Sequence, residues 1–211
     1  GVIPRFQLYL FDVDGTLVDS AADICGAVRE ALAEAGVDQL SDAYLRSFIG
    51  HHLFDLFREV LPDSTQEDRE RLLARYRSIY LARRHAATRV YPGVEEMLAG
   101  LGGLKSTATT KSSETARQVL ELFGLARHFD HIQGTDGFPS KPAPDVVLRS
   151  LERLGVRPED CLLVGDAAPD MEAGRRAGVR TCAVTWGYGD LEAMRSHQPD
   201  FWIDSPAELL S

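Results

Sequence analysis

Acidic side chains stand where short apolar runs of the sequence end. Asp12 and Asp14 follow one such run, and Asp166 follows another, with Asp170 one helical turn later. Carboxylates that are buried together repel one another unless a cation is present. Carboxylate oxygens are the ligands that hard divalent metals prefer, and Mg²⁺ is the expected ion. If the fold brings these residues together, the sequence predicts a magnesium site.

Hydroxyl and ammonium groups occur at comparable positions. Thr109, Thr110 and Lys111 stand at the end of a further predicted strand, and Lys141 lies in a loop between Ser140 and Pro142. The chain has only three lysines, and two of them, Lys111 and Lys141, fall at the edge of the expected site. The alternative for Lys111 is that it merely begins a solvated helix, since surface charges rarely carry function. Together, carboxylates, hydroxyls and lysines suit an anionic substrate held beside a metal.

The elements that position these residues alternate between two patterns. The apolar run at 6–11 predicts a strand, and similar short runs predict strands at 106–109, 131–133, 161–165, 181–185 and 201–203. Helical patterns separate the later runs, at 94–101, 114–123, 144–154 and 170–177. Alternation of this kind predicts an α/β fold with a doubly wound parallel sheet, a Rossmann-like core. Ligands of such sheets bind beyond the carboxyl ends of the strands, where the residues named above would converge.

One interval between predicted strands is too long for this alternation. About 90 residues separate the first predicted strand from the second, although a crossover between parallel strands needs only about a dozen. The excess is helical, with one apolar stripe along 24–35 and another along 72–80. We therefore predict an all-helical cap domain at 19–87, inserted into a catalytic core made of 1–18 and 88–211.

Composition narrows the function classes. The chain has 211 residues, with 23 basic and 32 acidic side chains and a formal net charge of −9, which disfavours partners such as nucleic acid or an anionic membrane. Hydrophobic content of 44% and charged content of 26% are typical of a folded globular protein. No apolar run approaches the roughly 20 residues of a membrane span. Three dispersed cysteines and the lack of a leader pattern favour buried free thiols and a cytoplasmic location.

The motifs, in this order, resemble the haloacid dehalogenase superfamily. Residues 11–20 read FDVDGTLVDS, which is similar to its first motif, DxDGT after an apolar strand. Thr109 resembles the second motif, Lys141 in KPAPD the third, and GDAAPD at 165–170 the fourth, GDxxxD. The return at 91–94, YPGV, resembles phosphoglycolate phosphatase-like members with a helical cap after the first motif. This chain has Thr110 where relatives often have Asn and Ala167 where they often have Ser, so the identity of the substrate stays open.

The resemblance implies a phosphatase mechanism. Asp12 would be the nucleophile that forms an aspartyl-phosphate, and Asp14 would protonate the leaving group and then activate water. Lys141 would pair with Asp12 and a phosphoryl oxygen. Thr109 and Thr110 would bind phosphoryl oxygens with Lys141.

The resemblance also implies how Mg²⁺ is held. The Asp12 carboxylate, the Asp14 backbone carbonyl and Asp166 would be its ligands, and Asp170 would orient them.

The expected function is hydrolysis of a small phosphorylated metabolite, with 2-phosphoglycolate as the first candidate from the overall resemblance. Gly50 interrupts a helical pattern of the cap, and the resemblance implies that the loop at this point lies over the phosphate site. His51 and Arg46 could then meet a second anionic group of the substrate. A sugar-phosphate mutase of the β-phosphoglucomutase kind is an alternative, and a non-catalytic binding protein on the same fold is another. The chain is expected to be a monomer or a homodimer.

Overall fold

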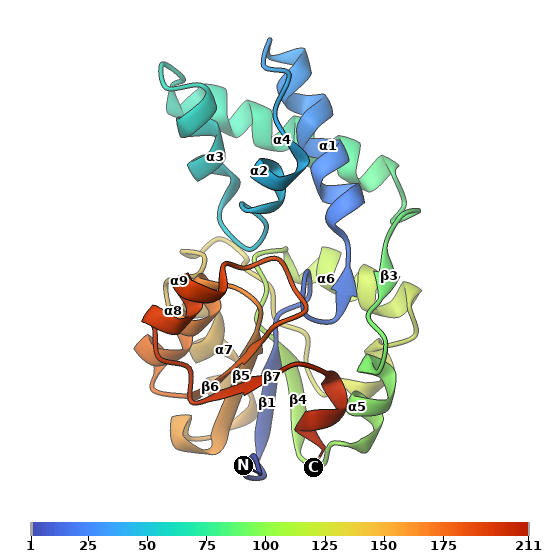
Figure 1. Ribbon diagram of the computed structural model, residues 1–211, viewed down its shortest axis with the longest axis vertical. Helices are drawn as coiled ribbons and strands as arrows, with labels where there is room; N and C mark the ends of the chain where they lie inside the picture. Colours follow the sequence, from blue (N-terminus) through green and yellow to red (C-terminus); the bar gives the residue numbers. More distant parts are fainter. Residues whose placement is uncertain (1, 211) are drawn as a thin grey trace.

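A sheet of five parallel strands forms the centre of the larger part of the molecule (Figure 1). The computed structural model describes residues 2–210. In spatial order the strands are β4 (Leu104–Thr107), β1 (Leu8–Phe11), β5 (Cys161–Gly165), β6 (Arg180–Val184) and β7 (Phe201–Ile203). Each of them was predicted from a short run in the sequence, and the ends agree to within two residues.

Both faces of the sheet are covered. Alternate side chains of β1 point to opposite faces: Leu8 and Leu10 belong to one apolar cluster, and Tyr9 and Phe11 to another. Helices α7 (Asp145–Leu154) and α8 (Ala168–Ala177) contribute to the first cluster, and α5 (Val94–Gly100) and α6 (Ser113–Leu122) contribute to the second. This confirms the expected doubly wound α/β core and explains why β1 is apolar at every position.

Further short elements complete the core. Helix α9 (Leu191–Ser196) packs Met194 against Met171 and Ala183. Three short 3₁₀ helices lie at Ala126–His128, Pro158–Asp160 and Pro206–Leu209.

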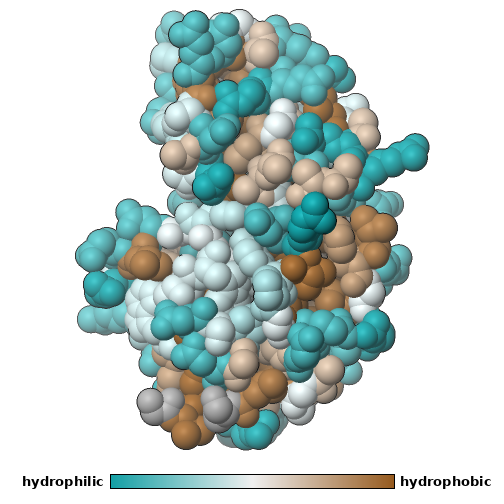
Figure 2. Space-filling view, turned by 45° about the vertical axis from the view of Figure 1, so that its right-hand side comes forward, coloured by the Kyte–Doolittle hydropathy of each residue, from teal (hydrophilic) through white to brown (hydrophobic). Residues whose placement is uncertain are grey.

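Four helices lie beyond the carboxyl ends of the strands (Figure 1). They are α1 (Ala21–Glu34), α2 (Asp42–Arg46), α3 (Leu53–Val60) and α4 (Gln66–Ala82). They share an apolar cluster of their own, in which Leu32, Leu56 and Phe57 are fully buried. In the space-filling view they form a separate lobe above the core (Figure 2). We call this lobe the cap.

The chain enters and leaves the cap through a two-stranded ribbon, which we call the hinge. Strand β2 (Val18–Asp19) pairs antiparallel with β3 (Arg89–Val90). In the first turn of α1, the buried Asp23 accepts hydrogen bonds from Arg83 Nε (2.9 Å), Ala87 N (2.9 Å) and Thr88 Oγ1 (2.7 Å). These bonds lower the pKa of Asp23 although burial alone would raise it. Strands of two residues have no detectable periodicity, so the ribbon was not predicted.

One predicted strand is wrong. Residues 131–133 run beside β4 but form no strand. Thr107 is the reason, because its Oγ1 both donates to the Gln133 carbonyl (3.0 Å) and accepts from the Gln133 N–H (2.8 Å). A side chain of β4 thus takes the place of the backbone partner that a ladder would need. Lys141 lies in a loop, as predicted, but no strand precedes that loop.

All three cysteines are buried and free, as predicted. Burial raises the pKa of Cys25, of Cys161 and of Cys182, so their thiols stay protonated at neutral pH.

Candidate active site

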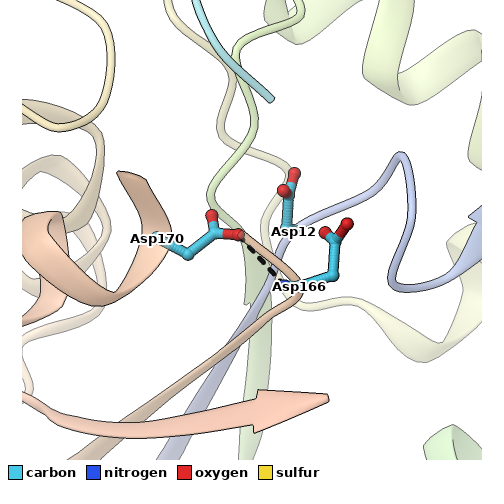
Figure 3. A group of neighbouring side chains, drawn as sticks. All are labelled: Asp12, Asp166 and Asp170. Carbon is cyan, nitrogen blue, oxygen red and sulfur yellow. Dashed lines mark hydrogen bonds between the residues drawn. The ribbon is translucent and has the colours of Figure 1, made fainter. Parts of the chain in front are cut away.

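Three carboxylates meet at the carboxyl ends of the central strands. Asp12 follows β1, Asp166 follows β5, and Asp170 lies in the first turn of α8. One oxygen from each lies within 4.8 Å of the others, and Figure 3 shows the side chains gathered there. Each of these residues is at most 3% exposed. We call these three residues the acidic cluster.

Asp12 is the least satisfied member of the cluster. Its Oδ1 accepts the N–H of Val13 at 2.7 Å, whereas its buried Oδ2 has no hydrogen-bond partner among the described residues. Burial raises the pKa of Asp12 well above its ordinary value, and the charge of Asp170 raises it further. Lys141 opposes this effect from 3.3 Å. Apart from this ion pair with Lys141, Oδ2 lacks the hydrogen-bond donor that a buried carboxylate oxygen normally has.

Lys141 supplies the positive charge at the cluster. Its Nζ donates to Asp170 Oδ1 at 2.5 Å and to the Ala108 carbonyl at 2.7 Å, and it lies 3.3 Å from Asp12 Oδ2. Burial alone would lower the pKa of Lys141, but the neighbouring Asp12 and Asp170 raise it. Lys141 is therefore a cation in the folded protein.

The other two carboxylates are held by loops. Asp166 accepts the Thr16 hydroxyl on Oδ1 (3.0 Å) and the Tyr188 N–H on Oδ2 (2.9 Å). Asp170 Oδ2 accepts the N–H groups of Asp166 (3.1 Å) and Ala167 (3.2 Å), so both of its oxygens have donors. Burial and the charge of Asp170 raise the pKa of Asp166 to about 7.

The donor set fits a hard divalent cation. Three carboxylates face a single lysine, which leaves two negative charges in a buried space when all are ionised. The unpartnered Oδ2 of Asp12 is the atom that such a cation would satisfy. Mg²⁺ prefers oxygen ligands, and the expected pair of Asp12 and Asp166 supplies them.

Asp14 points away from this cluster and toward the cap. Its Oδ1 accepts the Ser20 hydroxyl at 2.6 Å, and its Oδ2 lies 3.3 Å from Lys111 Nζ. Lys111 also donates to the Tyr80 hydroxyl at 2.6 Å and lies over the Tyr80 ring. The Lys111 side chain is only 8% exposed, so it does not merely begin a solvated helix.

A cavity of about 430 Å³ lies between the core and the cap, within the usual size range of small-molecule sites. On the core side Asp14, Thr110 and Lys111 line it. Thr109 is fully buried behind them, and its Oγ1 accepts the Lys111 N–H at 3.2 Å. Thus Asp14 faces the cavity together with the residues that follow β4.

From the cap, Gly50 and His51 line this cavity, together with Tyr76 and Arg77. Burial lowers the pKa of His51, so its ring is neutral at pH 7. Arg46, in contrast, is exposed and is not among the lining residues. The reason is the orientation of α2, whose Leu45 points into the cap interior and turns the next residue outward.

Thr16 and Tyr188, which hold Asp166, were missed from the sequence. Tyr188 lies in the segment Trp186-Gly187-Tyr188-Gly189, directly after β6. The rule that sites gather at carboxyl ends of strands applied to this segment as well, and its closely spaced glycines were a second signal.

Comparison with known proteins identifies the family. The haloacid dehalogenase-like hydrolase family model matches residues 9–184. A phosphoglycolate phosphatase of Aquifex aeolicus is 36% identical over 208 residues, which cover 97% of this chain and 95% of the relative. Phosphoglycolate phosphatase 1 of Pseudomonas aeruginosa is 36% identical over 218 residues, covering 99% of this chain and 79% of the relative.

Solved structures agree with this match. The crystal structure of a predicted phosphatase from Clostridium acetobutylicum superposes with a TM-score of 0.91 at 29% identity, over 98% of this chain and 97% of that chain. The family match spans Asp12, Lys141 and Asp166. With its sheet, its acidic cluster and its sequence all in agreement, the chain belongs to the haloacid dehalogenase-like hydrolase family.

Proposed function

We propose that this chain is a Mg²⁺-dependent phosphatase that hydrolyses a small phosphomonoester through an aspartyl-phosphate. The observation that carries the proposal is the buried Asp12 Oδ2, which lacks a hydrogen-bond partner and faces Lys141 beside two further carboxylates. The relatives named phosphoglycolate phosphatase support a phosphoric monoester hydrolase and make 2-phosphoglycolate the first candidate substrate.

In the proposed reaction, one oxygen of the Asp12 carboxylate attacks phosphorus and the bond to the leaving oxygen breaks, while the other oxygen remains for the metal. Lys141, 3.3 Å from Asp12 Oδ2, neutralises a phosphoryl oxygen and keeps Asp12 ionised. Thr109 and Thr110, at the end of β4, are proposed to donate to the other phosphoryl oxygens. Bound Mg²⁺ would supply further charge neutralisation, with Asp12, the Asp14 carbonyl and Asp166 as its proposed ligands.

Proton transfer is assigned to Asp14. Its carboxylate faces the cavity, where it can protonate the leaving oxygen and later take a proton from the water that hydrolyses the aspartyl-phosphate. Ser20 and Lys111 hold this carboxylate from two sides, at 2.6 and 3.3 Å. Asp170, whose oxygens already accept three hydrogen bonds, is proposed to orient Lys141 and the Asp166 backbone.

The cap is proposed to select the substrate. We propose 19–87 as its boundaries and assign Gly50 and His51 to the contact with the non-phosphate end. Because the His51 ring is neutral at pH 7, it would serve there as a hydrogen-bond donor and not as a cation.

The location is proposed to be cytoplasmic and the chain a monomer or a homodimer. Within residues 2–210 no helix has the length and apolar character needed to span a membrane.

A panel of phosphorylated metabolites, with free phosphate as the readout, tests the proposal. Phosphate release is expected for small substrates in Mg²⁺, loss of release in EDTA, and accumulation of a phosphorylated protein in Asp14→Asn. A bisphosphate-primed interconversion of sugar phosphates without net phosphate release would instead establish the mutase.

The role of His51 is tested separately. We compare kcat/KM for 2-phosphoglycolate with kcat/KM for a phosphate ester whose leaving group is uncharged. The ratio of the first value to the second is expected to fall in His51→Ala. An unchanged ratio would refute the role given to the cap loop.

A further inference from the structure

Tyr188 connects two separate parts of the site. Its backbone N–H donates to Asp166 Oδ2 at 2.9 Å, and its phenol oxygen lies at the start of α1, where the chain enters the cap. One residue of the core therefore contacts both the acidic cluster and the hinge.

The phenol replaces a missing helix cap. Its oxygen accepts the N–H groups of Ser20 (2.8 Å) and Ala21 (3.0 Å) and donates to Asp19 Oδ1 at 2.5 Å. Ser20 is the N-cap residue of α1, but its hydroxyl donates to Asp14 and caps nothing. A side-chain oxygen on the first N–H groups is what normally stabilises a helix start. The first helix of the cap thus depends on an oxygen that the core supplies.

Gly187 and Gly189 have no side chain, which allows the Tyr188 backbone to lie directly against Asp166. A Cβ at Gly187 would lie 2.3 Å from the Cβ of Asp166, and a Cβ at Gly189 would lie 2.0 Å from the Asp166 carbonyl oxygen. No side chain fits between the loop and this carboxylate. Because closely packed atoms transmit displacement, movement of the Tyr188 backbone must move Asp166 or break their hydrogen bond.

We propose that Tyr188 is a positioning residue that couples the hinge of the cap to the Asp166 carboxylate. Fixing the carboxylate then fixes the loop, and the loop holds the start of α1 through the phenol. Coupling of this kind is reciprocal, so the state of the hinge also acts on Asp166. The inference rests on the proposed function in one respect, the binding of Mg²⁺ by Asp166.

Hydrogen exchange of the hinge tests the coupling without any substrate. The readout is the exchange rate of the Ser20 and Ala21 amides, measured with and without Mg²⁺ in wild type and in Tyr188→Phe, which keeps the backbone N–H to Asp166. Tyr9→Phe is the matched control, because the Tyr9 hydroxyl also accepts a backbone N–H, that of Phe6 at 3.1 Å, at the other end of the sheet. Calorimetry with Mg²⁺ alone measures metal binding in each protein.

We expect Mg²⁺ to slow exchange of the two amides in wild type and in Tyr9→Phe. In Tyr188→Phe these amides should exchange about fivefold faster, and added Mg²⁺ should no longer slow them. If Tyr188→Phe does not fold, Asp19→Asn serves in its place, because it weakens the group that accepts the Tyr188 phenol proton. In Asp19→Asn, Mg²⁺ should slow exchange of the two amides less than it does in wild type.

Two results would overturn the coupling: bound Mg²⁺ that leaves wild-type hinge exchange unchanged, or an equal response in wild type and Tyr188→Phe. Absence of Mg²⁺ binding to wild type would refute the proposed metal site itself, and calorimetry separates that failure from the other two.

Discussion

Asp166 is predicted to make the metal-free protein less stable as the pH rises. Burial and the neighbouring Asp170 raise its pKa from 3.8 to about 7, because the ionised form loses water and meets another negative charge. Replacing Asp166 with Asn removes this charge and keeps the contacts. The Asn carbonyl can accept the Tyr188 N–H, and its amide can donate to the Thr16 hydroxyl, which also accepts.

The sign and size follow from the two pKa values. The folded state holds the Asp166 proton more tightly than the unfolded chain, so its stability contribution is complete below pH 3.8 and lost as the pH rises through 7. The whole change is about 4 kcal/mol, of which about 3 kcal/mol falls between pH 5 and pH 8. Relative to wild type, Asp166→Asn should therefore gain about 3 kcal/mol between these two pH values.

Urea unfolding in EDTA at pH 5 and pH 8 measures this difference. Asp23→Asn is the contrasting control, because hydrogen bonds from Thr88 and Arg83 lower the pKa of Asp23 in spite of its burial. Its contribution is present above pH 3.8 and is lost only as the pH falls below that value. Asp23→Asn should thus be destabilised by about 2 kcal/mol at pH 8. If Asp166→Asn gains no stability between pH 5 and pH 8, the account of the acidic cluster is wrong.

Three further predictions concern residues of the same site. Asp12→Asn should lower the rate of phosphate release about 10³-fold or more, because an amide cannot replace the anionic nucleophile. Near-normal turnover would contradict this, once mass spectrometry has excluded deamidation of the Asn. Lys141→Met should lower the free energy of unfolding in urea by about 3–5 kcal/mol, because Asp12 and Asp170 lose their buried counter-charge. A loss smaller than about 1 kcal/mol would count against that pairing. Lys111→Met should lower kcat/KM about tenfold with folding intact, because Asp14 loses one of its two supports, and an unchanged value would show that Ser20 alone suffices.

Much of the site followed from local sequence combined with one rule of topology. Apolar runs that stop at a turn identified β1 and β5, since both faces of these strands are covered and every residue in them is buried. Parallel strands end at the same edge, so Asp12 and Asp166 could be placed together although they are far apart in the chain. Lys141 does lie beside them, but it does not follow a strand. The helical cap was visible as an interval too long for a crossover.

Other features depended on the tertiary structure because they arise from contacts between distant segments. Arg46 and His51 share a short stretch of sequence, yet only the packing of α2 decides that one is exposed and the other lines the cavity. Thr107 displaced the predicted strand at 131–133 through side-chain bonds that no periodicity reveals. Tyr188 accepts the Ser20 N–H although 168 positions separate the two residues. This contact matters because the Ser20 hydroxyl donates to Asp14 and is not available to cap α1. Sequence patterns record which side chains are apolar, whereas the partner of each polar group is decided by the packing that brings it within hydrogen-bond distance.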